Sequence, residues 1–157
     1  MVKKYREEYS ERKIILDTTY VLPILGIEVE GLDRDILDHL IKYELYYPAL
    51  LLVELESVVL KEARKRGLKS IPEQAIKGLN FLIYSGEINI VAPTGEDLKV
   101  MYELLRRGWK DIFDLSLYAT AIRIDSRVLT MDKSFKKFLK DHGFHYQLLI
   151  THKELKT

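Results

Sequence analysis

Residues 110–135 limit the folds open to this chain more than any other part of the sequence. Residues 112–124 place apolar side chains on two stripes at helical spacing, so most of the helix circumference is covered. A short apolar run over 128–131 follows and ends on Asp132. The pattern predicts an interior helix that leads into a buried strand with an acid at its end.

The same stretch brings Asp114 and Asp132 to one edge of the predicted sheet. If residues 128–131 form a parallel strand, the preceding helix runs antiparallel to it and begins where the strand ends. Each acid also has a structural explanation, because Asp111 with Asp114 makes a carboxylate variant of the capping box and Asp132 caps the next helix. Helix N-termini favour acids, so on these residues alone capping is the better-supported interpretation.

Two more segments repeat the arrangement of an apolar run with an acid beside it. Residues 13–16 form a strand candidate that ends at Asp17. Pro48 is expected to open a helix in which Glu54 lies beside the apolar stripe, whereas Glu56 points elsewhere. Of these two glutamates, Glu54 is the candidate for a site.

Strands that alternate with helices predict an α/β fold, a three-layer α/β/α sandwich with a mainly parallel central sheet. Further strands are expected at 46–47, 88–91 and 147–150, and further helices from Asp33, Pro72 and Pro93. Ligands bind outside the carboxyl ends of the strands in such sheets. That edge receives Asp17, Glu54, Asp114 and Asp132. Glu96 and Asp97 are also expected to open a helix at this edge, so topology reduces the number of candidate site acids but does not decide among them.

Composition excludes several classes of protein. The 157 residues predict a single domain over 1–157 with a polar arm at 1–12, and the absence of cysteine excludes a disulfide framework and a thiol nucleophile. A net charge of +1 gives no global case for a polyanion partner. No apolar run is long enough to span a membrane, and the charged N-terminus does not match a signal peptide, so a cytoplasmic location is expected. Few Asn and Gln among many Lys, Glu and Arg residues are typical of thermophile proteins.

Several carboxylates in one crevice imply a divalent cation. Like charges close together raise each other's pKa unless a cation compensates them. Oxygen ligands without cysteine or a histidine cluster favour Mg²⁺ or Mn²⁺ over zinc. A site of this kind suits the hydrolysis of phosphodiester bonds.

Four motifs in order resemble the PIN domain family, metal-dependent ribonucleases that include the VapC toxins of toxin–antitoxin pairs. They are ILDTTYVL with Asp17, PALLLVELESV with Glu54, DLSLYATA with Asp114, and VLTMDKSF with Asp132. The resemblance covers residues 13–150. It implies an endoribonuclease that cuts single-stranded RNA with Mg²⁺ or Mn²⁺, forms a homodimer and has a small antitoxin protein as partner.

The resemblance also implies a role for each matching residue. Asp17, Glu54 and Asp114 would be metal ligands or lie next to them, Asp132 would hold water at the metal, and Thr18 and Thr130 would support these acids through their hydroxyl groups. Asp111 lies on the same helix face as Asp114, which leaves open which of the two coordinates. The arm before Lys13 is longer than the family's usual start, and no role is assigned to it.

Basic side chains flank two of the motifs. Arg106, Arg107 and Lys110 precede the acidic helix and Lys133 follows Asp132, so both flanks are candidates for holding phosphates, with Trp109 stacking on a base. The competing interpretation is that these are solvated helix ends and a core tryptophan.

Other functions fit less well. A haloacid-dehalogenase-like phosphatase needs a second aspartate where Thr19 stands, and a dinucleotide-binding domain needs a glycine-rich turn after the first strand. The remaining rival is a PIN fold used as an RNA-binding or assembly module with little or no nuclease activity. For the homodimer, the helices around Val58 and Leu82 carry the candidate surface.

Overall fold

A single parallel sheet forms the centre of the fold. The computed structural model describes residues 12–155, so most of the arm expected at 1–12 lies outside the described residues. The strands pair in the order β3-β2-β1-β4-β5, and every pairing is parallel. Their bounds are β1 Lys13–Leu16, β2 Glu44–Pro48, β3 Ile88–Val91, β4 Arg127–Leu129 and β5 Leu149–Ile150.

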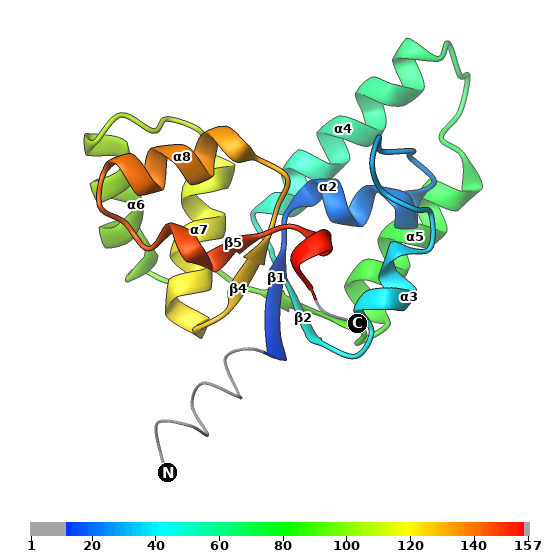
Figure 1. Ribbon diagram of the computed structural model, residues 1–157. Coiled ribbons are helices and arrows are strands. Elements are labelled where there is room, and N and C mark those ends of the chain that lie inside the picture. Colours follow the sequence, from blue (N-terminus) through cyan, green and yellow to red (C-terminus); the bar gives the residue numbers. More distant parts are fainter. Residues whose placement is uncertain (1–11, 156–157) are drawn as a thin grey trace.

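Strand β1 is the central strand and is covered on both faces. Ile14, Ile15 and Leu16 are fully buried, as expected for a parallel strand whose sequence is a continuous apolar run. The chain builds β2 and β3 on one side of β1 and then crosses to build β4 and β5 on the other side (Figure 1). This reversal creates a topological switch point beside the carboxyl ends of β1 and β4, where ligands bind in such sheets.

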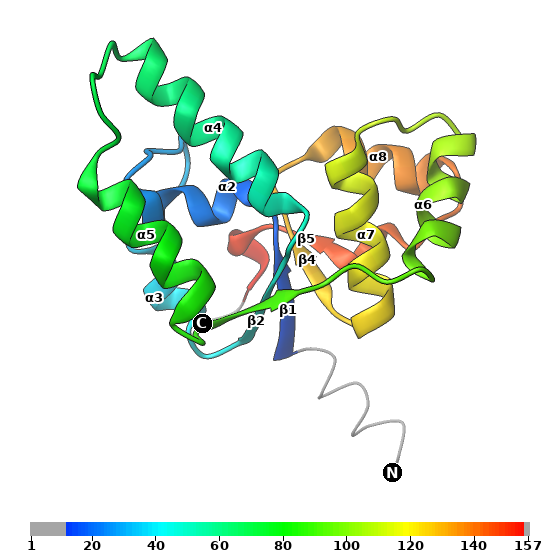
Figure 2. The same ribbon diagram turned by 180° about the vertical axis from the view of Figure 1, so that it is seen from behind.

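Helices cover both faces of the sheet, which confirms the predicted three-layer α/β sandwich. Figures 1 and 2 show one group, α2 to α5, on one side and a second group, α6 to α8, on the other. The first group comprises α2 Thr18–Val21, the 3-10 helix η1 Leu22–Leu25, α3 Ile36–Leu40, α4 Leu51–Lys65 and α5 Glu73–Tyr84. The second comprises α6 Asp97–Arg106, α7 Ile112–Ile124 and α8 Lys133–Asp141, followed around β5 by the 3-10 helices η2 Tyr146–Leu148 and η3 His152–Glu154.

Helix α7 is the interior helix that the sequence predicted. Its residues 115–121 are all buried. Both ends differ from the prediction, because Ile112 is 49% exposed and Ile122 is 40% exposed. Among the described helices, none is long and apolar enough to cross a membrane.

Some boundaries differ from those predicted. Pro48 ends β2 instead of opening a helix, because it still pairs with Val91 of β3 and the Ala49 N–H donates to the Val91 carbonyl at 2.9 Å. The helix predicted from Asp33 begins only at Ile36. The last strand is shortened because residues 146–148 form a 3-10 turn.

Candidate active site

Asp17 lies at the carboxyl end of the central strand, and its carboxylate is held from two sides. Oδ1 accepts a hydrogen bond from the Thr18 backbone N–H at 2.7 Å, and Oδ2 accepts one from the Thr130 hydroxyl at 2.7 Å. The Asp17 N–H donates to the Leu129 carbonyl at 3.0 Å. The ends of β1 and β4 therefore fix both the backbone and the side chain of this acid.

Asp132 is joined to the same cluster through Thr130. The Asp132 N–H donates to the Thr130 hydroxyl oxygen at 3.1 Å, so one threonine links the Asp17 carboxylate to the Asp132 backbone. The Asp132 side chain accepts from the Phe135 N–H at 2.9 Å and caps α8, as its position before a helix predicts. Capping and a place at the acidic edge are therefore compatible.

Asp111 and Asp114 have different surroundings at the start of α7. Asp111 is exposed, and its Oδ1 accepts from the Phe113 N–H at 2.9 Å and the Asp114 N–H at 3.2 Å, which is the predicted cap. Asp114 is half-buried, and its Oδ2 accepts from the Trp109 indole Nε1–H at 3.0 Å. One acid caps the helix, and the other is oriented by a tryptophan.

The contact between Trp109 and Asp114 was not foreseen from the sequence. The indole packs on Phe135, with ring centroids 5.0 Å apart, and on Phe138 at 5.1 Å, both on α8. A tryptophan N–H usually needs a partner when the ring packs in this way, and an acid five residues later is within reach. Trp109 thus ties the start of α7 to α8.

Glu54 lies in the first turn of α4, close to a buried hydroxyl pair. The Tyr47 hydroxyl donates to the Leu51 carbonyl at 2.8 Å and lies 2.9 Å from the Thr18 hydroxyl. Tyr47 is fully buried, so it joins the end of β2, the start of α4 and the residue after Asp17. Sequence analysis missed this tyrosine, because an apolar strand position gives no signal for it.

The acids at this edge share one electrostatic environment. Burial raises the pKa of Asp114 to about 7, and the negative charge of Asp111 raises it further. The hydrogen bond from Trp109 lowers this pKa, whereas the charges of Asp17 and Asp132 raise it. Burial also raises the pKa of Asp17. The hydrogen bonds from Thr130 and Thr18 lower this pKa, and the negative charges of Asp132 and Asp111 raise it. Each charge therefore makes the next harder to ionise.

Glu54 belongs to the same environment. Burial raises its pKa, the Thr18 hydroxyl lowers it, and the charges of Asp17 and Asp111 raise it again. Glu56, two residues on, is exposed, which agrees with the choice of Glu54 as the site candidate. The structure thus brings all four predicted acids and Asp111 to the carboxyl edge of the sheet.

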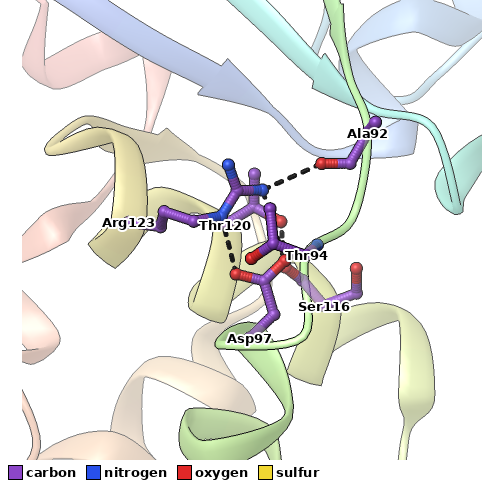
Figure 3. Close-up of polar contacts among 6 residues, drawn as sticks. All are labelled: Ala92, Thr94, Asp97, Ser116, Thr120 and Arg123. Carbon is purple, nitrogen blue, oxygen red and sulfur yellow. Dashed lines mark hydrogen bonds and ion pairs between the residues drawn. The ribbon is translucent and has the colours of Figure 1, made fainter.

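Asp97, which the sequence also placed at this edge, lies elsewhere, because its partner Arg123 is in the last turn of α7 whereas Asp114 is in the first turn. Arg123 Nε donates to its Oδ1 at 2.8 Å and Arg123 Nη2 to its Oδ2 at 3.2 Å, and the Thr94 N–H donates to Oδ2 at 3.0 Å (Figure 3). Burial raises the pKa of Asp97, but the hydrogen bonds from Arg123 and Thr94 outweigh it and leave the pKa below its ordinary value. Glu96 pairs on the surface with Lys99. Neither acid is available to the cluster.

The sequence profile of the PIN domain matches residues 14–140 of the 157. The chain belongs to the PIN domain family. A comparison with curated proteins finds no match. Membership of the PIN family implies a nuclease-type or RNA-related function, and PIN domains generally bind divalent metals. The VapC-like subtype and the thermophile origin stay predictions.

The acids at the PIN domain's carboxyl edge fit a divalent cation by their chemistry. They offer carboxylate oxygens, and within residues 12–155 none of them forms an ion pair with a lysine or arginine. In the same part of the chain, no three acidic or histidine side chains come together as a ready-made metal cluster. Because Mg²⁺ usually takes one or two carboxylates and keeps several waters, two acids suffice to hold it.

The predicted substrate residues differ in their surroundings. Arg106 pairs with Glu103 at 3.0 Å, whereas Arg107, Lys110 and Lys133 are exposed. The Trp109 indole is half-buried between α7 and α8, as the core-packing interpretation expects. Its contacts therefore give Trp109 a role in orienting Asp114.

Proposed function

We propose that this PIN domain is an endoribonuclease that hydrolyses phosphodiester bonds of single-stranded RNA with Mg²⁺ or Mn²⁺. The observation that supports it most is the group of acids at the sheet edge whose pKa values are raised and which form no ion pair with a lysine or arginine of residues 12–155. Partly buried carboxylates that lie close together destabilise the folded protein when they are ionised, unless they bind a cation. The acids are therefore best explained as ligands.

Each acid has a part in this proposal. Asp17, Glu54 and Asp114 would be metal ligands or lie next to them, and Asp132 would hold water at the metal. Thr130 and Thr18 fix the Asp17 carboxylate, and Thr18 also lowers the pKa of Glu54. Bound there, the metal would activate water and stabilise the leaving oxygen of the phosphodiester.

The test uses a mixed pool of single-stranded RNA with Mn²⁺, Mg²⁺ or EDTA. We expect products with either metal and none in EDTA. Glu54→Gln should abolish cleavage, whereas Glu56→Gln, the same change two residues on at an exposed position, should not. RNA that is retained without products would support the binding or assembly module instead.

We also propose a homodimer that uses the outer face of α4 and α5. Leu82, in the helix named by the sequence prediction, is fully buried, so it is not part of such a surface. Exposed apolar side chains do occur on both helices, namely Val53, Leu60, Ile76, Phe81 and Tyr84. A monomer mass at every concentration in light scattering would contradict the dimer. The antitoxin partner and the cytoplasmic location stay predictions from the resemblance and the composition.

A further inference from the structure

Helix α8 carries a stripe of lysines that starts next to the acidic cluster. Lys133, Lys136, Lys137 and Lys140 follow the spacing i, i+3, i+4 and i+7, so they share one face. Phe135 and Leu139 are buried on the opposite face. The residue before the helix is Asp132, so the lysine stripe leads away from the candidate active site.

A second basic segment, residues 107–110, packs against the same helix through Trp109. Trp109 packs on α8 through its ring and donates to Asp114 through its Nε1–H. Arg107 and Lys110 lie on either side of this tryptophan in the chain, and both are exposed. The two basic segments therefore meet at the border of the acidic cluster.

Within the part of the chain that the structure describes, only one lysine of the stripe forms an ion pair. Lys137 pairs with Asp141 at 3.1 Å, and Lys140 lies 5.5 Å from the centroid of the Tyr146 ring. Lys133 and Lys136 form no ion pair with any residue among 12–155. These ammonium groups are thus available to an anion from solution.

The other border of the cluster has the opposite charge. The loop between η1 and α3 approaches Met131, because a Cβ placed on Gly31 would lie 3.4 Å from the Met131 Cε. Its exposed charged residues are acidic except Arg34, which pairs with Glu28; the acids are Glu28, Glu30, Asp33 and Asp35. A polyanion is therefore attracted on the α8 side and repelled on the loop side.

We propose that single-stranded RNA reaches the acidic cluster along the lysine stripe of α8, with its phosphates on Lys133, Lys136 and Lys140, and does not cross the acidic loop. The proposal rests on the ribonuclease function proposed above and specifies the path of its substrate. Residues four apart on a helix are about 6 Å apart along its axis, so an extended strand can place neighbouring phosphates on successive lysines. Contacts of this kind position RNA without reading its sequence.

The experiment measures binding without cleavage. Fluorescence anisotropy of a labelled single-stranded RNA in EDTA compares the wild type with Lys136→Gln/Lys140→Gln. The control is Lys61→Gln/Lys65→Gln, which removes the same charge at the same spacing from exposed positions of α4. Melting temperatures of both variants show whether either one is simply less stable.

We expect the α8 variant to bind about 10-fold more weakly or worse, while the control stays within about 2-fold of the wild type. The slope of log affinity against log salt should fall by about 1.4 in the α8 variant, because each lost phosphate contact on a single strand removes about 0.7. Equal losses in both variants, or no binding by the wild type, would overturn the proposal.

The two proposals fail in different ways. RNA that binds through α8 but is never cut with Mn²⁺ would contradict the ribonuclease and leave the path intact. Cleavage by the wild type together with equal binding by both variants would contradict the path and leave the ribonuclease intact.

Discussion

Asp97 and Asp114 each lie in the first turn of a helix on the same side of the sheet, yet their surroundings have opposite effects. Asp97 is 4% exposed and held by Arg123, and its pKa is lowered. Asp114 has the neutral indole of Trp109 as its donor, and its pKa is raised to about 7. An acid with its own cation serves packing, whereas an acid without one is suited to bind a cation from solution.

Helix α7 takes part in both arrangements. Its first turn supplies Asp114 to the acidic cluster. Its last turn supplies Arg123 to Asp97 (Figure 3). Arg123 also donates to the Ala92 carbonyl at 3.0 Å, so it fastens the segment after β3 as well as α6. Substitutions that remove the charge of Asp114, Asp97 or Arg123 test directly whether the two acids differ in this way.

The largest effect is expected for Asp114→Asn. The substitution keeps the size of the side chain and leaves an oxygen for the Trp109 N–H, but removes a negative ligand. We expect the cleavage rate at saturating Mn²⁺ to fall by about 1,000-fold, because a bound metal supplies several kcal/mol of transition-state stabilisation. Rates on labelled RNA, with melting temperatures in parallel, measure this.

The matched control is Asp111→Asn, one turn earlier. Asparagine caps a helix about as well as aspartate, so we expect most activity and an unchanged melting temperature. A dead Asp111→Asn variant beside an active Asp114→Asn variant would move the metal ligand one turn earlier on α7.

The next largest effect is expected for Arg123→Met, which leaves the Asp97 charge buried without its cation. We expect the free energy of unfolding to fall by about 3 kcal/mol, the low end for a broken buried pair. The low end applies because the Arg123 side chain is 28% exposed. Chemical denaturation measures the change.

Adding Asp97→Asn to Arg123→Met tests the cause. The neutral amide removes the unpaired charge, so the double variant should recover a large part of the lost stability. If the double variant is no more stable than Arg123→Met, the loss comes from packing and from the Ala92 contact.

A smaller effect is expected from pH in metal-free protein. The folded state keeps a proton on Asp114 up to a pH of about 7, whereas the unfolded chain releases it near its ordinary pKa of 3.8. Stability from this group is therefore lost as the pH rises toward 7, and we expect a fall of about 1–2 kcal/mol between pH 5 and 8 in EDTA.

Asp114→Asn should reduce the slope of stability against pH between pH 5 and 8, whereas Asp97→Asn should leave this slope unchanged. The lowered pKa of Asp97 contributes stability above its ordinary value of 3.8 and loses it only on stronger acidification. Denaturation midpoints across this pH range in EDTA separate the two acids. Equal slopes in the wild type and Asp114→Asn would contradict the difference in their surroundings.

The sequence predicted the architecture because its signals are local. Apolar runs that end in Asp17 and Asp132 predict strands and the edge they share, and the spacing of residues 112–124 predicts a buried helix. The local turn signal at Pro48 was misleading, because the long-range pairing of β2 with β3 continues through it.

The distinction between Asp97 and Asp114 was not predictable in this way. Arg123 is 26 residues from Asp97 in the chain, and Tyr47 is 29 residues from Thr18. Such pairs form only when the sheet has brought distant segments together. The sequence therefore placed Asp97 at the same edge as Asp114, and only the tertiary contact with Arg123 in the last turn of α7 shows that Asp97 lies elsewhere.

The hydrogen bond from Trp109 to Asp114 also has a spectroscopic consequence. Trp109 is the chain's single tryptophan, so selective excitation reports on this ring alone. Indole emission depends on the charges and hydrogen bonds around the ring, and here the Nε1–H is bound to a carboxylate of the acidic cluster. We therefore expect the emission of Trp109 to follow the charge on Asp114, so that titration with a metal can be read without a label.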